Sequence, residues 1–266
     1  MLNTQLLSHI NDAILQKMTH KTTSWGEVAD WYDDHLKGKD TYHEKVLAPN
    51  LVRMLALVPG ERVLEVGCGE GYFSRIIAKA GGKVLATDIS KELIALAEKK
   101  GGGVTYKVLS AERLTGIDSA TYDVGVAILT IQNMEKIDAV FSELARTLTN
   151  KGRIIIILNH PAFRIPKRSS WGYDGATNTQ YRRIDGYLSQ TKEKIVMHPG
   201  KNSGEVTFSF HRSLQDYMKA LHKCGFGISR LEEWISHKTS VGAKAKAENT
   251  SRTEIPLFMA IECRKF

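Results

Sequence analysis

The chain has 266 residues, of which 42% are hydrophobic and 25% are charged, and its net charge of +8 corresponds to a pI of about 9.3. This composition is typical of a globular protein with one large domain and appendages, and no apolar run reaches the roughly 18 residues that a membrane-spanning helix requires. The three cysteines are too scattered to indicate a disulfide framework or a metal site, so we predict a cytoplasmic protein without a metal.

Residues 1–58 have the spacing of amphipathic helices. Apolar residues recur every three or four positions in Met1–Met18, Trp25–Leu36 and Thr41–Leu57. Pro49 is expected to interrupt the third helix because proline has no backbone N–H, and Pro59-Gly60 is expected to end it. We predict that residues 1–58 form a helical lid, in which Tyr32 is a candidate substrate contact.

The segment Val63–Tyr72 gives the strongest indication of a ligand-binding site. An apolar run leads into three glycines at alternating positions, Gly67, Gly69 and Gly71, and a helical spacing follows. Glycine permits a tight turn and lets a ligand approach the backbone, while the helix start behind the loop offers unpaired N–H groups. The G-x-G-x-G spacing differs from the G-x-G-x-x-G of dinucleotide sites, and the signature of a P-loop is absent. Glu65, just before the loop, would repel a pyrophosphate and attract a cationic amine.

The next two predicted strands end near acidic residues. Asp88 ends the strand that begins at Lys83, and Glu112 follows the strand Val104–Leu109. Ligands of open α/β sheets bind at such strand ends, where Asp88 can accept hydrogen bonds from two ribose hydroxyls and Glu112 from an adenine amine. Together with Glu65, these acids lie at three consecutive strand ends, which favours a nucleoside-containing ligand over three incidental surface charges.

Strands and helices alternate through the middle of the chain. We predict strands at 62–66, 83–87, 104–109, 123–128 and 153–158, and helices at 72–80, 90–99 and 137–148. This alternation implies a doubly wound α/β fold, in which helices cover both faces of a parallel sheet. The continuous apolar run Ile154–Leu158 is expected of a strand that is buried on both sides. The segments 228–234 and 257–264 are predicted to be the last two strands.

Residues 159–212 break this alternation, and we predict that they form an insert that caps the substrate. Prolines, glycines and polar aromatic residues are frequent there, and we predict a hairpin with the arms Tyr181–Leu188 and Glu193–His198. His160 and His211 are candidates for a catalytic base, although His160 can instead fix the turn after the preceding strand.

The remaining signals concern substrate contacts and the C-terminal region. Gln132 and Asn133 follow a predicted strand and can either contact the substrate or cap the next helix, while Trp171 and Tyr181 can either line a pocket or serve packing. Ser213-x-x-Asp216 is a capping box, which predicts the start of a helix. The polar segment Val241–Arg252 is predicted to be a surface loop or a short helix.

These features resemble the class I S-adenosylmethionine-dependent methyltransferases, and most closely their broad type 11 branch of small-molecule enzymes. The matching segments are Val63–Gly71, Thr87–Ser90, Ser110–Glu112, Tyr122–Val124, Ala127–Thr130 and Leu148–Arg153. The resemblance implies a Rossmann-like, doubly wound sheet of seven mostly parallel strands, the last two of them antiparallel. It also implies a core over 59–266, with the lid and the insert as additions, and S-adenosylmethionine as the cofactor.

The resemblance further assigns residues to the methionine part of the cofactor. Glu65 is expected to face the methionine amine. The loop residues that pass along the methionine are Gly67, Cys68 and Gly69. Leu129 and Thr130 are expected to border the methionine and the reactive methyl group. We expect Cys68 to be a small packing residue rather than a nucleophile.

The nucleoside part of the cofactor is assigned to the ends of the next two strands. By the resemblance, Asp88 binds the ribose and Ile89 packs on the adenine. Ala111 and Glu112 meet the edge of the adenine ring.

Three functions are compatible with these residues. The favoured one is methyl transfer to oxygen, nitrogen or carbon of a small acceptor molecule, which needs a general base only when the acceptor must lose a proton. An RNA methyltransferase is an alternative, because basic residues cluster in the insert at Arg164, Lys167, Arg168, Arg182 and Arg183. A subunit that binds the cofactor without catalysis is the third, since a fold does not determine a function. We expect a small-molecule partner rather than nucleic acid, and a monomer or a homodimer.

Overall fold

A central sheet of seven strands organises the computed structural model, which describes residues 40–196 and 206–266. The strand order is β10-β11-β5-β4-β1-β2-β3. The strands are β1 (Arg62–Val66), β2 (Lys83–Asp88), β3 (Thr105–Val108), β4 (Tyr122–Ile128), β5 (Leu148–Asn159), β10 (Phe226–Trp234) and β11 (Phe258–Lys265). Strands β1 to β5 pair in parallel, and β11 runs antiparallel to both β5 and β10. The predicted doubly wound, mostly parallel sheet is therefore confirmed.

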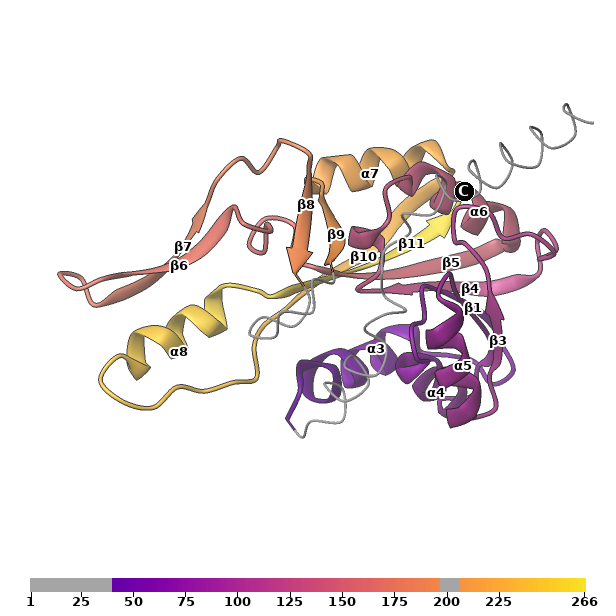
Figure 1. The fold of residues 1–266 in the computed structure, drawn as a ribbon, viewed down its shortest axis with the longest axis horizontal. Coiled ribbons are helices and arrows are strands. Elements are labelled where there is room, and N and C mark those ends of the chain that lie inside the picture. The colour runs from indigo at the N-terminus through magenta and orange to yellow at the C-terminus, as the bar shows by residue number, and fades with distance from the viewer. Residues whose placement is uncertain (1–39, 197–205) are drawn as a thin grey trace, which may run out of the picture.

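Helices cover both faces of this sheet (Figure 1). One face carries α6 (Ile137–Thr147) and α7 (Leu214–Lys223), and the other carries α3 (Ala48–Leu55), α4 (Tyr72–Lys79) and α5 (Lys91–Lys100). Strand β5 shows why its sequence is continuously apolar. Ile154 and Ile156 pack into the core under α6 and α7, whereas Ile155 and Ile157 pack into the opposite core, because successive strand side chains point to opposite faces.

The helix that was predicted over Thr41–Leu57 consists of two pieces. A π-helical turn, η1 (His43–Leu47), leads directly into α3, and Pro49 lies in the first turn of α3. Proline cannot donate the hydrogen bond that a continuous helix needs, so the interruption predicted from Pro49 is present. The helices predicted over 1–18 and 25–36, together with Tyr32, lie outside the described residues.

The insert contains two hairpins, and the predicted hairpin is wrong. Strand β6 (Ser169–Asp174) pairs with β7 (Thr179–Ile184), and β8 (Thr191–Val196) pairs with β9 (Val206–His211). Asp174 makes the first turn, since its carboxylate accepts hydrogen bonds from Ala176 N and Thr177 Oγ1. Gly172 faces the Tyr181 ring, which leaves no room for a Cβ at that position. The Asp174 turn and the fit of Tyr181 over Gly172 favour the β6–β7 pairing over the predicted hairpin between 181–188 and 193–198.

The β6–β7 hairpin extends away from the sheet and lies beside α8 (Ala245–Glu254), as Figure 1 shows. The Ser251 hydroxyl on α8 donates a hydrogen bond to Gln180 O on β7 at 2.9 Å, and the Lys244 ammonium lies over the Tyr173 ring. The segment that was predicted as a loop or short helix thus forms α8. The other hairpin remains close to the sheet, because β9 packs against η2 (Ile131–Asn133), a 3₁₀ turn after β4.

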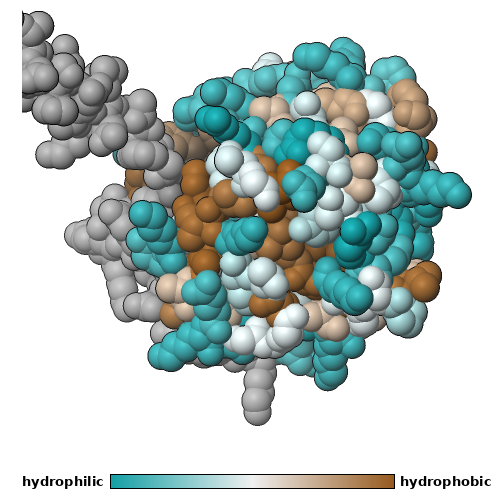
Figure 2. Space-filling view, turned by 90° about the vertical axis from the view of Figure 1, so that its right-hand side faces the viewer, coloured by the Kyte–Doolittle hydropathy of each residue, from teal (hydrophilic) through white to brown (hydrophobic). Residues whose placement is uncertain are grey.

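Figure 2 shows the face that lies at the right of Figure 1. Apolar residues gather near the centre of this face, and hydrophilic residues surround them. Strand β11 points toward this face and runs antiparallel to β5, so the parallel strands end at the opposite edge of the sheet. Within residues 40–196 and 206–266, no helix is long and apolar enough to cross a bilayer.

The start of α7 provides a test of the local sequence signals. Ser213 Oγ accepts a hydrogen bond from Asp216 N, and the Asp216 carboxylate accepts one from Ser213 N, which completes the predicted capping box. We expect Ser213→Ala to lower the free energy of unfolding by about 1 kcal/mol, measured by urea denaturation. Ser170→Ala, at an exposed position on β6, is the control and should leave stability unchanged. Equal losses in both variants would contradict the capping role.

Candidate functional site

The loop between β1 and α4 requires glycine at several positions. Gly67, Gly69 and Gly71 adopt φ values of 66°, 57° and 79°, which side chains with a Cβ rarely tolerate. A Cβ at Gly67 would also collide with the Thr130 side chain, and one at Gly71 would collide with the Tyr106 ring. The glycines therefore serve both the turn and the close approach of neighbouring segments.

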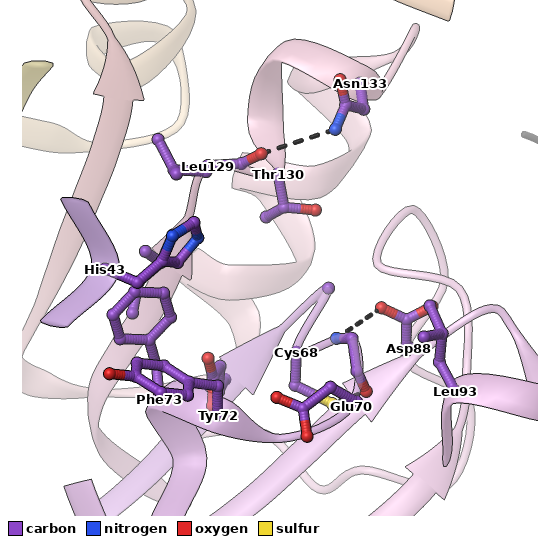
Figure 3. A pocket seen from close by; sticks show the side chains of 14 residues that line it. His43, Cys68, Glu70, Tyr72, Phe73, Asp88, Leu93, Leu129, Thr130 and Asn133 are labelled. Carbon is purple, nitrogen blue, oxygen red and sulfur yellow. Dashed lines mark hydrogen bonds between the residues drawn. The ribbon is translucent and has the colours of Figure 1, made fainter. Parts of the chain in front are cut away.

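Asp88 ties this loop to the end of β2. Its Oδ2 accepts a hydrogen bond from Gly69 N at 2.9 Å, and its Oδ1 accepts one from Ser90 N at 2.9 Å (Figure 3). Burial raises the pKa of Asp88, while the N–H groups of Ser90 and Gly69 act in the opposite direction. Ser90 also begins α5, because its hydroxyl accepts a hydrogen bond from Leu93 N.

A pocket with about 620 Å³ of empty space, part of it open to solvent, lies against the loop. Figure 3 shows Asp88 and Leu93 at one end and His43, Tyr72 and Phe73 at the other. The lining residues are His43, Glu65, Gly67, Cys68, Gly69, Glu70, Tyr72, Phe73, Asp88, Leu93, Ile128, Leu129, Thr130 and Asn133. The pocket is acidic at one end and aromatic at the other, so it can hold a molecule with chemically different ends.

Two buried acids line the pocket, each 1% exposed. Burial raises the pKa of Glu65 to about 8, the nearby Asp88 and Glu70 add to the rise, and a hydrogen bond from Ser74 opposes it. Glu65 is therefore protonated at neutral pH until a cation approaches. Glu70 pairs with Arg75 and Lys100 through Oε2, while its Oε1 has no hydrogen-bond partner among the described residues.

Most of the predicted cofactor residues meet in this pocket. The seven that line it are Glu65, Gly67, Cys68, Gly69, Asp88, Leu129 and Thr130. Three others do not line it: Ile89 is 45% exposed beside Asp88, and Ala111 and Glu112 lie beyond the end of β3.

The two histidines that were predicted as catalytic bases lie outside the pocket. The Nε2 of His160 bonds to Glu233 Oε1 at 2.7 Å, and its Nδ1 accepts hydrogen bonds from the backbone N–H groups of Ala162 and Phe163. Both ring nitrogens are occupied, so His160 fixes the turn after β5. The Nε2 of His211 donates to Tyr187 O at 2.7 Å, which holds that ring within the insert. Both rings thus have structural contacts, and their catalytic role stays a prediction from the sequence.

The substrate contacts predicted from the sequence also lie elsewhere. Trp171 and Tyr181 are on the projecting β6–β7 hairpin, 39% and 49% exposed, and Gln132 lines a separate hollow. They are not among the residues that line the pocket.

Sequence reasoning missed the aromatic end of the pocket. The His43 ring stacks on Phe73 at 5.6 Å between centroids, and Tyr72 meets it edge-on at 6.0 Å. Tyr72 and Phe73 directly follow the glycine loop, so their position there was a usable signal. Asn133 lies on the segment after β4 that the sequence had already indicated. No local signal identified His43, because it reaches the pocket through packing between distant segments.

The comparisons with known proteins agree with this geometry. Residues 64–156 match a family model described as a methyltransferase domain. A ubiquinone biosynthesis O-methyltransferase from Burkholderia thailandensis is 28% identical over 110 residues, which are 40% of this chain and 47% of the relative. An uncharacterized protein from Haemophilus influenzae is 22% identical over 201 residues, or 72% of this chain and 77% of the relative. The chain thus spans about half the length of the first of these curated relatives.

Solved structures extend the similarity over most of the chain. An S-adenosylmethionine-dependent methyltransferase from Mesorhizobium loti has a TM-score of 0.65 and 25% identity, and the match covers 82% of this chain and 96% of that one. A structure from Listeria monocytogenes, described as a putative S-adenosylmethionine-dependent methyltransferase, has a TM-score of 0.65 and 23% identity. The match covers 82% of this chain and 98% of that one, and it supports the fold.

Gly67→Ala tests the shape of the loop. We expect a loss of at least about 2 kcal/mol in the free energy of unfolding, from the left-handed conformation and from the collision with Thr130. The double variant Gly67→Ala/Thr130→Gly removes the collision and should lose less than the sum of its two single variants, measured by urea denaturation. Strict additivity would contradict the close approach.

Glu65→Gln tests the buried acid. The folded-state pKa of about 8 lies above the ordinary value of 4.5, so between these values the folded chain holds the extra proton and stability falls as pH rises. Gln keeps the hydrogen bond from Ser74 without ionising. We expect the variant to gain stability over the wild type, by several kcal/mol, as pH rises from about 5 to about 8. Parallel stability curves for both proteins would contradict the raised pKa.

Proposed function

We propose that this chain, whose core is a class I S-adenosylmethionine-dependent methyltransferase domain, transfers the cofactor's methyl group to oxygen, nitrogen or carbon of a small acceptor molecule. The observation that carries the proposal is the convergence of Asp88, Glu65 and the glycine loop on one pocket. Curated relatives named as ubiquinone biosynthesis O-methyltransferases favour oxygen as the attacked atom.

The residues of the pocket fit this cofactor. In the proposal, Asp88 accepts hydrogen bonds from the ribose, and Glu65 releases its proton to face the cationic methionine amine. Gly67 and Thr130 approach each other closely and both line the pocket, so in the proposal they form one wall along the methionine part of the cofactor. Ile89, Ala111 and Glu112 remain proposed contacts of the adenine.

The cofactor supplies a methyl group on a positively charged sulfur, which is already activated for in-line displacement. The protein's task is to align the acceptor and exclude water. We assign this task to the aromatic end of the pocket, where His43, Tyr72 and Phe73 lie together and Asn133 faces them from beyond β4 (Figure 3). The His43 imidazole is the proposed base for an acceptor that must lose a proton.

The contacts of the basic cluster in the insert do not favour RNA as the acceptor. Arg182 donates hydrogen bonds to Phe163 O and Ser169 Oγ, Arg183 pairs with Asp185, and Lys167 pairs with Glu193. Because these side chains already bond within the insert, we propose a small molecule as the acceptor. A location in the cytoplasm remains a prediction from the sequence.

The proposal is tested by binding of the reaction product, S-adenosylhomocysteine, measured by calorimetry. We expect the wild type to bind it, and Asp88→Asn to weaken binding by about tenfold or more, because the amide is a poorer acceptor for ribose hydroxyls than a carboxylate. Asp118→Asn, which changes an exposed acid outside the pocket, is the matched control and should bind normally. Absence of binding to the wild type would overturn the proposed function.

A further inference from the structure

A second hollow lies at the same edge of the sheet as the cofactor pocket. It has about 310 Å³ of empty space, part of it open to solvent, between the end of β5, strand β9 and the 3₁₀ turn η2. We infer that this hollow, here called the oxyanion hollow, binds a carboxylate or phosphate group of the acceptor through Arg164 and Arg212. The inference rests on the proposed function and adds the chemical class of the substrate.

Arg164 has no acidic partner among the residues that the structure describes. Its guanidinium lies 5.4 Å from the centroid of the Phe258 ring, and it forms no ion pair with any carboxylate in the described part of the chain. Burial lowers the pKa of Arg164, which shows that the guanidinium is partly withdrawn from water. A cation in this position is costly unless an anion compensates for its lost hydration. Residues 40–196 and 206–266 do not supply that anion through an ion pair.

Arg212 adds a second cation, only 7% exposed. Its Nη2 donates hydrogen bonds to the carbonyl oxygens of Met134 and Glu135, while its Nη1 is buried without a hydrogen-bond partner in the described chain. Buried polar atoms without partners are rare in folded proteins and indicate a missing ligand or water. Nη2 of Arg212 is thus held by the protein, whereas Nη1 is left to donate a hydrogen bond to a ligand.

The rest of the lining has polar groups and no acid among the described residues. Asn159, Ser209 and Tyr217 line the hollow and carry N–H or O–H groups that can donate hydrogen bonds. Two guanidinium groups without a carboxylate make the local potential positive. Arginine presents its N–H donors in a planar fork that matches carboxylate and phosphate oxygens, so the chemistry selects an oxyanion.

The turn η2 connects the oxyanion hollow with the cofactor pocket. Thr130 and Asn133 line the cofactor pocket, whereas Gln132 lines the hollow, so this one short segment contributes to the walls of both. Asn159, at the end of β5, places the hollow at the edge where the proposed methyl transfer takes place. An acceptor anchored here by its oxyanion can extend its reactive atom toward Thr130 and His43.

Calorimetric titration of the full chain tests the inference. Inorganic phosphate and benzoate are the two probes, added in Tris-chloride buffer with and without saturating S-adenosylhomocysteine. We expect at least one probe to bind at one site per chain, and the probe that binds identifies the oxyanion as phosphate or carboxylate. Arg164→Ala and Arg164→Gln should each weaken that binding by about tenfold or more, since a charge-assisted hydrogen bond is lost.

Arg183→Ala is the matched control. It removes one positive charge from the same insert at an exposed position, and binding of the probe should stay within about twofold of the wild type. Thermal unfolding of each variant shows that the chain is folded, and Arg164→Gln keeps most of the side-chain volume. S-adenosylhomocysteine should bind all variants equally.

The outcomes separate the inference from the proposed function. Failure of both probes to bind the wild type overturns the oxyanion hollow, as does equal binding by Arg164→Gln, even if S-adenosylhomocysteine binds normally. Failure of S-adenosylhomocysteine to bind, with probe binding as expected, overturns the proposed function and with it the assignment of the oxyanion to an acceptor.

Discussion

The hydrogen bond from Gly69 N to the Asp88 carboxylate, at 2.9 Å, holds the candidate cofactor site together. It joins the loop after β1 to the end of β2, two segments that lie side by side because the strands pair in parallel with Val66 opposite Thr87. The loop can turn toward Asp88 only because Gly69 adopts a positive φ. The contact thus positions Asp88 beside the loop and beside Leu93 of α5 at one end of the pocket.

The layered core puts the remaining parts of the site in place. Helices on both faces bury the central strands, so the loops after β1, β2, β4 and β5 converge at one edge of the sheet. The turn η2 is central to this arrangement, because it lines the cofactor pocket on one side and the oxyanion hollow on the other. A cofactor and an anionic acceptor would thus be positioned by a single short segment.

The insert shows the limit of local reasoning. Its β6–β7 hairpin depends on the Asp174 turn and on the fit of the Tyr181 ring over Gly172, which apolar periodicity does not reveal. His160 and His211 are predicted as catalytic bases from their positions at the two ends of the insert. The rings of His160 and His211 form hydrogen bonds that hold parts of the insert. His43, which no sequence pattern indicates, lines the pocket.

The sequence by itself determined the alternation of strands and helices, the glycine loop and the acids at the ends of β1 and β2. These features are local, because hydrophobic periodicity and the glycines that permit positive φ angles can be recognised from neighbouring residues. The packing of distant segments brings His43 into the pocket and places Arg164 and Arg212 along one hollow. Such meetings depend on packing between segments far apart in the chain, which no local pattern encodes.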